Sequence, residues 1–200
     1  QGDVLFSSLL YVQAGHQLAD LLYELKRTVE ADYWRAQAEI TAVSIRKVFW
    51  DSQIGLFRAA TVRAKEPDIW GSVFAVYIGV ADSEQSKEIG NYLKNHYTGI
   101  VKQGQIRHLP AGVYWEKTGA VDTYQNGGFW ATPVGWFVYA LDTIDPKLAD
   151  KTVLDMVADI QQNGACEYLT AEKHVLPNYL ASASLPLDGF RKMLKRRQIR

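Results

Sequence analysis

The chain is poor in cysteine, in net charge and in long apolar runs. Its 200 residues contain one cysteine, Cys166, which excludes an intramolecular disulfide framework. Lys and Arg number 22, as do Asp and Glu, so zero net charge gives no electrostatic reason to expect nucleic acid as a partner. No apolar run approaches the roughly 20 residues that span a bilayer, and Gln1-Gly2-Asp3 does not begin a signal peptide. We therefore expect a soluble protein with no membrane partner.

Signatures of metal, phosphate and thiol chemistry are also missing. The four histidines, His16, His96, His108 and His174, have no metal-ligand spacing, and no Gly-rich phosphate loop is present. Cys166 and His174 could form a thiol nucleophile and its base only with a third member, which the sequence does not supply. We therefore expect no metal and no cofactor.

Helical periodicity dominates what is present, and it predicts an all-α chain of antiparallel helical hairpins in a single domain, residues 1–200. Small β-hairpins are expected only in the long loops. Two predicted helices are apolar all round, which predicts burial on every side: 70–81 and 133–143. The expected helices cover 4–26, 31–49, 70–81, 84–97, 133–143 and 146–162, and a last helical region is broken near Pro186. The expected N-caps of the helices that start at 84, 133 and 146 are Ser83, Thr132 and Asp145.

The connections alternate between short and long. Trp70 and Asp82 bracket one apolar helix, and Trp130 and Asp142 bracket the other, at an offset of 60 residues, which indicates a repeat of helix pairs. In antiparallel helices every second connection lies at the same end. We therefore expect the three long loops, 50–68, 99–128 and 164–179, to share one face, where function concentrates.

Aromatic side chains mixed with carboxylates and amides in these loops suit a sugar, which has an apolar C–H face and a polar rim. Each Trp taken alone is better explained by packing between helices, and Asp68 fits a helix N-cap as well as a sugar ligand. Several tryptophans on one face favour a carbohydrate partner. The candidate substrate-binding residues are Trp50, Asp51, Asp68, Trp70, Trp115, Tyr124, Gln125, Asn126, Trp130 and Tyr179.

Two glutamates are candidates for catalysis. Glu167 begins a segment of the third long loop and could be the base that activates water, because inverting glycosidases pair such a carboxylate with a carboxylic acid. A structural, hydrogen-bonded acid explains Glu167 equally well. Glu116 follows Trp115 and is an acid, a substrate ligand or merely solvated.

Three motifs resemble the six-hairpin glycosidase superfamily, in particular rhamnosidase-like and amylo-glucosidase-like enzymes. The motifs are Asp68-Ile69-Trp70-Gly71-Ser72, Tyr124-Gln125-Asn126-Gly127-Gly128-Phe129-Trp130, and Gly164-Ala165-Cys166-Glu167-Tyr168 with Tyr179-Leu180-Ala181-Ser182-Ala183 after it. The resemblance covers most of the chain, through about Gly189. It implies an (α/α)6 toroid and inverting hydrolysis of a glycoside.

The chain is shorter than the resemblance requires. About seven helices are expected here against twelve in the toroid, so the chain looks like the C-terminal portion of an incomplete barrel. The general acid would then precede Gln1, and Asp3 is the only carboxylate near that place. We expect a homo-oligomer or additional N-terminal sequence to complete the toroid. Two alternatives remain: a sugar epimerase or polysaccharide lyase using His174, Tyr124 and Tyr179, or a helical-repeat protein that binds carbohydrate without catalysis.

Overall fold

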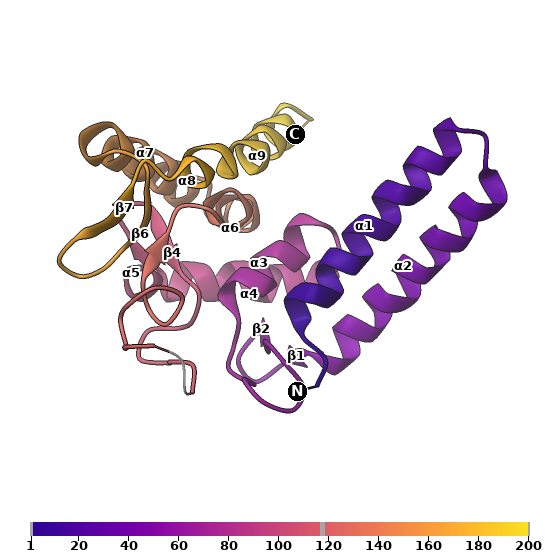
Figure 1. Ribbon diagram of the computed structural model, residues 1–200, viewed down its shortest axis with the longest axis horizontal. Coiled ribbons are helices and arrows are strands. Elements are labelled where there is room, and N and C mark those ends of the chain that lie inside the picture. The colour runs from indigo at the N-terminus through magenta and orange to yellow at the C-terminus, as the bar shows by residue number, and fades with distance from the viewer. Residues whose placement is uncertain (1, 117–118, 200) are drawn as a thin grey trace.

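A computed structural model describes residues 2–116 and 119–199 (Figure 1). The helices of these ranges are α1 (Leu5–Glu24), α2 (Thr28–Val48), α3 (Ile69–Tyr77), α4 (Ser83–Asn95), α5 (Tyr97–Ile100), α6 (Val134–Leu141), α7 (Pro146–Asn163), α8 (Leu180–Ser184) and α9 (Pro186–Ile199). The strands are β1 (Trp50–Asp51), β2 (Leu56–Phe57), β3 (Val101–Lys102), β4 (Gln105–Arg107), β5 (Phe129–Trp130), β6 (Cys166–Leu169) and β7 (His174–Pro177). None of the described helices is long and apolar enough to cross a bilayer.

The prediction of an all-α fold is wrong, because the chain combines helices with two antiparallel sheets. Among the described residues, β1 and β2 form a two-stranded sheet, and β3-β4-β5-β6-β7 form a five-stranded sheet in that order. The larger sheet joins segments far apart in sequence: Ile106 pairs with Trp130, and Phe129 pairs with Leu169. The physical reason is that loops packed against the core must satisfy their backbone N–H and C=O groups, and they do so by pairing with each other.

Helices α1, α3, α6 and α9 form a row in which each packs against the next (Figure 1). Helix α2 packs along α1 as a hairpin that extends away from the remaining helices, and α7 packs against α6. The main hydrophobic core runs through this row, and a smaller cluster of Ala19, Leu22 and Ala31 closes the distal half of the α1–α2 hairpin. The two short helices predicted to be buried, α3 and α6, do lie in the interior of the row, with Val73 and Phe137 fully buried.

Carboxylate caps set where three helices begin. Asp68 accepts a hydrogen bond from the Gly71 N–H at the start of α3, and Asp145 accepts one from the Leu148 N–H at the start of α7. The sequence predicts both of these caps. Asp82, rather than Ser83, caps α4 through a reciprocal capping box with Gln85. The expected cap at Thr132 is absent, since α6 begins after Pro133 without a side-chain cap bond.

A buried carboxylate attaches the C-terminal helix to the row. Asp142 follows α6 and has no exposed surface. Its Oδ2 accepts a hydrogen bond from Arg196 at 2.9 Å, and its Oδ1 accepts one from Arg197 at 2.6 Å. Arg196 also donates to the Tyr139 carbonyl at 2.6 Å and lies 4.1 Å from the centre of the Tyr139 ring. These contacts fix α9 against α6 from three directions.

We predict that Asp142→Ala lowers the free energy of unfolding by about 3 kcal/mol, because it leaves two guanidinium groups without their buried counter-charge. Urea denaturation of the purified chain measures the change. The matched control is Asp155→Ala, which removes an ion pair with Lys151 on the surface of α7 and is expected to change stability by less than about 1 kcal/mol. Equal effects of the two substitutions would contradict a special role for Asp142.

Candidate functional site

The three long connections lie on one face, as the alternating lengths predicted. Strands β3 and β4 come from the second connection, β5 follows it, and β6 and β7 come from the third. The first connection joins them through the Ile69 N–H, which donates to the His108 carbonyl at 3.0 Å. The backbone therefore positions the side chains of all three connections relative to one another.

An aromatic cluster fills this face. The Trp70 ring stacks on the His108 ring with centroids 4.3 Å apart and planes 7° apart, and Trp115 meets His108 edge-on at 5.2 Å. On the other side Trp70 meets Trp130 edge-on at 5.7 Å. Trp130 in turn stacks on Tyr168 at 5.5 Å, and Tyr124 packs its edge against both. This packing explains how four of the predicted aromatic residues come together.

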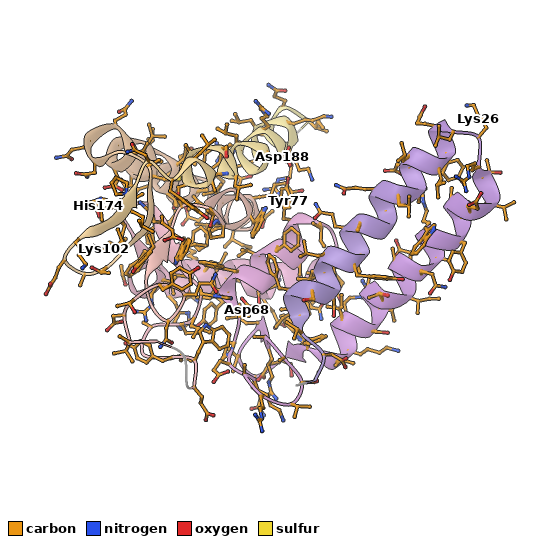
Figure 2. The ribbon with its side chains drawn as sticks, viewed as in Figure 1. Lys26, Asp68, Tyr77, Lys102, His174 and Asp188 are labelled. Atoms are coloured by element: carbon orange, nitrogen blue, oxygen red, sulfur yellow. The ribbon has the colours of Figure 1, made fainter. Side chains whose placement is uncertain are left out.

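Asp68, the N-cap of α3 (Figure 2), is the carboxylate that meets this cluster, through His108. It is buried, its Oδ1 accepts a hydrogen bond from the Gly71 N–H at 2.7 Å, and the same oxygen lies 3.1 Å from Nε2 of the His108 ring. The Nδ1 atom is buried and has no hydrogen-bond partner among the described residues. The sequence therefore identified the carboxylate but not the histidine that orients it.

Two adjoining pockets open beside this pair. One has a volume of about 390 Å³ and is lined by Val4, Phe6, Ala59, Ala60, Arg63, Ala64, Asp68, His108, Trp115 and Gln125. The other has a volume of about 430 Å³ and is lined by Phe6, Trp70, His108, Tyr124, Gln125, Trp130, Thr132, Pro133, Trp136, Tyr179 and Leu185. Because Phe6, His108 and Gln125 line both, the two pockets form one cleft with a partition between them. We call this the aromatic cleft.

The turn that carries Tyr124, Gln125 and Asn126 is held by its own backbone and by Trp115. The Tyr124 carbonyl accepts from the Gly128 N–H and from Trp130 Nε1. The buried Asn126 side chain accepts from the Trp115 N–H at 2.7 Å, and Trp115 Nε1 donates to the Gln125 carbonyl at 3.2 Å. Tyr124 has a φ of 44°, a conformation that costs a non-glycine residue energy and is enriched at functional sites. Asn126 thus supports the turn, while Tyr124 and Gln125 line the cleft.

Two predicted binding residues lie outside the cleft. Trp50 packs edge-on against Phe57 within the β1–β2 hairpin, with centroids 5.0 Å apart. Asp51 accepts from Arg58 Nη2 at 2.6 Å and from the Gln53 N–H at 3.0 Å. The Arg58 guanidinium lowers the pKa of the Asp51 carboxyl. Neither residue lines either pocket of the aromatic cleft, so packing and turn formation account for both.

The two catalytic candidates lie at the margin of the cleft. Glu167 is half-buried on β6, next in sequence to Tyr168 of the aromatic cluster, and it lines neither pocket. Among the described residues no hydrogen bond or ion pair of its carboxylate is found. Glu116 follows Trp115 and, with Arg63, Lys65 and Glu66, lines a separate pocket beside the first connection. Asp3, the remaining acid considered from the sequence, pairs its backbone with Thr61.

The sequence did not identify the ring side chains of His108, Phe6 and Trp136, which line the cleft, or Tyr168 of the adjoining aromatic cluster. His108 follows β4, and its position depends on the pairing of β4 with β5, for which the sequence has no local signal. Phe6 and Trp136 belong to apolar helices, where any aromatic residue is expected in the core. Phe6 stacks on Phe74 at 5.2 Å and meets Trp136 at 6.0 Å, so these two form the helical side of the cleft.

His174, considered from the sequence as a proton-transfer group, belongs to a different cluster (Figure 2). Its Nε2 lies 2.8 Å from Oδ1 of the buried Asp159 on α7, which also accepts from Gln105 and Asn163. Burial raises the pKa of the nearby Cys166 thiol, which disfavours the thiolate that a nucleophile needs. In the described ranges no three His, Cys, Asp or Glu side chains gather to hold a metal ion. Asp159 therefore attaches β4 and the β6–β7 hairpin to α7.

We predict that Asp159→Ala speeds amide hydrogen exchange in residues 166–177 by at least about tenfold, because three donors lose a buried acceptor worth over about 1 kcal/mol. Exchange monitored by mass spectrometry resolves this segment. The control is Glu172→Ala in the exposed turn of the same hairpin, which is expected to leave exchange there unchanged. A uniform rise over the whole chain would show global destabilisation instead of release of the hairpin.

Comparison with known proteins shows a fold shared with parts of larger proteins. No protein-family model matches the chain, and no curated protein matches it. A GH78 family rhamnosidase of Bacillus sp. GL1 superimposes with a TM-score of 0.57 at 22% identity over 94% of this chain and 18% of that one. An uncharacterized conserved protein from Thermus thermophilus superimposes with a TM-score of 0.64 at 18% identity over 92% of this chain and 47% of that one. The chain thus spans less than half of either protein, and it shares its fold with a portion of a glycoside hydrolase.

Proposed function

We propose that the chain binds a carbohydrate in the aromatic cleft and forms part of a glycoside hydrolase. The observation that carries the proposal is the cleft itself, in which Trp70, Trp130, Tyr124 and Tyr179 surround a partition made by His108 and Gln125. Ligand sites in proteins are mostly apolar clefts with a few placed polar groups. The fold shared with a part of a GH78 rhamnosidase supports the same class of activity.

The lining suits the chemistry of a pyranose. Aromatic rings offer faces and edges to its C–H groups. Asp68 accepts hydrogen bonds, and the Gln125 amide offers both donors and acceptors to hydroxyls. Asp68 is the acidic residue of the described chain that lines the first pocket, and no acidic residue lines the second. The cleft is therefore suited to a neutral sugar better than to a cation.

For catalysis we propose Glu167 as the base that activates water in an inverting mechanism. Such a mechanism needs a second carboxyl group, about 6.5–9.5 Å away, as the acid that protonates the leaving oxygen. Glu116 is the next candidate for either role. The proposal for Glu167 rests on its place in β6 beside Tyr168, which contributes to the aromatic cluster.

Binding without hydrolysis is the second candidate function. The observation that favours it is that neither Glu167 nor Glu116 lines the two pockets. An epimerase or lyase is less well supported, because His174 is bound to Asp159 outside the cleft. Hydrolysis of a glycoside would reject the binding-only function, whereas saturable binding with no turnover by the unmodified chain would favour it.

We predict that Tyr179→Ala weakens sugar binding about fivefold, because stacking of this ring is worth about 1 kcal/mol. Titration calorimetry and tryptophan fluorescence with L-rhamnose, D-glucose and D-galactose measure affinity. The control is Tyr33→Ala on the exposed side of α2, which is expected to leave affinity unchanged. If none of the three sugars binds saturably, or if both substitutions weaken binding equally, the aromatic cleft is not the sugar-binding site.

We also predict that, in a complete enzyme that contains this chain, Glu167→Gln reduces hydrolysis at least about 100-fold with little effect on folding, because positioned acid–base groups contribute on this scale. Release of p-nitrophenol from a rhamnoside or glucoside measures turnover, and circular dichroism checks the fold. Glu172→Gln, in the exposed turn of the same hairpin, is the matched control. Turnover that survives Glu167→Gln would remove this residue from the mechanism and make Glu116 the next to test.

A further inference from the structure

The two ends of the helix row are chemically different from its interior. Helices α3 and α6 each pack between two neighbours of the row, whereas within the row α1 packs mainly against α3 and α9 mainly against α6. Further contacts are those of Phe6 with Trp136 and of Asp188 and Lys192 with Tyr77. Because α3 and α6 separate them, α1 and α9 do not cover each other (Figure 1). Each end helix therefore has a side that no described element of the row contacts.

Helix α1 carries apolar residues on this uncovered side. Its buried residues, which include Leu9, Val12 and Ala19, pack toward α2 and α3. A second series recurs at spacings of three and four residues, the period that brings side chains to one helix face. These residues are Leu10, Ala14, Gln17, Leu21 and Leu25, all exposed, and we call them the α1 stripe. Leu21 is 57% exposed and Leu25 is 60% exposed.

The C-terminal helices repeat the arrangement at the opposite end of the row. Pro186, Gly189 and Met193 are the buried residues of α9. The exposed series Leu180, Ser184, Leu187, Arg191 and Leu194 has alternating spacings of four and three across α8 and α9, and we call it the C-terminal stripe. Leu180 is 77% exposed and Leu194 is 53% exposed. Two helix faces with coiled-coil spacing are thus uncovered on one chain.

The helices that carry the two stripes have net charges of opposite sign. Helix α1 contains two acidic residues, Asp20 and Glu24, and no Lys or Arg. Helix α9 contains five basic residues and one acidic residue, Asp188. Arg196 and Arg197 are already bound to Asp142, but Arg191 and Lys195 have no ion-pair partner among the described residues. Glu24 also lies at the C-terminal end of α1, where the helix dipole disfavours an anion, so a cation beside it is stabilising.

From these observations we propose that a second copy of this chain covers both stripes, with the α1 stripe of one copy packed against the C-terminal stripe of its partner. Leucines interdigitate along the seam, and Glu24 lies opposite Arg191 or Lys195 as a flanking charge pair. A twofold axis forms the contact twice, so both uncovered faces are buried in one closed dimer. The proposal is independent of the sugar-binding function.

Sedimentation equilibrium and light scattering test the assembly. The expected mass is about 45 kDa, twice the 22.5 kDa of the chain. Leu21→Lys on α1 and Leu194→Lys on α9 are each expected to weaken dimerisation at least about tenfold, because each places a charge in an apolar seam. Both leucines are exposed in the single chain, so the fold is retained, and circular dichroism checks it. The control is Ile40→Lys, which alters an exposed apolar residue of α2 outside both stripes.

Charge exchange tests which helix meets which. Glu24→Lys and the pair Arg191→Glu with Lys195→Glu are each expected to weaken the dimer, and combining all three is expected to restore it at least about fivefold over either set. If the chain is a monomer at all concentrations, the proposal is overturned, and a segment of a longer polypeptide would have to cover the stripes instead. Disruption by Leu21→Lys without any effect of Leu194→Lys would also overturn it, since α1 would then pair with α1. A dimer insensitive to both leucine substitutions would place the interface elsewhere.

Discussion

The pairing of β5 with β4 and β6 is the constraint on which the candidate site depends. Strand β5 has two residues: Trp130 pairs with Ile106 of β4, and Phe129 pairs with Arg107 of β4 on one side and with Leu169 of β6 on the other. The pairing places His108, which follows β4, and Tyr168, within β6, on either side of the Trp70–Trp130 contact. Without it, the aromatic residues would belong to three separate loops, each able to move independently, and no cleft of fixed shape would exist.

The helices could be predicted from the sequence because their signals are local. Apolar periodicity indicated α1, α2, α4 and α7, and the composition of α3 and α6 indicated their burial. Asp68 and Asp145 could be predicted as caps because a carboxylate directly before a helix accepts a hydrogen bond from the first turn, and this interaction is local in sequence. The C-terminal ends of α3 and α6 were placed too late. After α3 the apolar run continues through Ile78, Val80 and Ala81, which hides the end of the helix. Because the periodicity of a helix extends over many residues, the helix is still predicted when its ends are misplaced by a few residues.

The sheet and the inner composition of the cleft could not be predicted in the same way. Strands of two to four residues are too short for an alternating pattern. The partners of β5 lie far away along the chain, since Trp130 pairs with Ile106 and Phe129 pairs with Leu169. His108 therefore looked like an isolated histidine, although its position is fixed by β4 and Asp68. That Trp50 lies outside the cleft could not be predicted for a different reason. The sequence around Trp50 resembles that around the other loop tryptophans, but Trp50 packs within a local hairpin against Phe57, seven residues away. The composition of the long loops therefore predicted which face carries the cleft, but not every residue that lines it.

Asp68 shows how one residue can serve both the fold and the site. Its Oδ1 accepts the hydrogen bond from the Gly71 N–H and also lies 3.1 Å from His108 Nε2. A carboxylate has about four lone-pair positions on its two oxygens, so the helix cap does not exhaust its capacity. The second oxygen needs the absence of a side chain at Gly71, where a Cβ would lie 2.7 Å from Oδ2. The cap, the glycine and the histidine together hold the carboxylate in one orientation at the wall of the cleft. A binding group fixed in this way loses little conformational entropy when a ligand arrives.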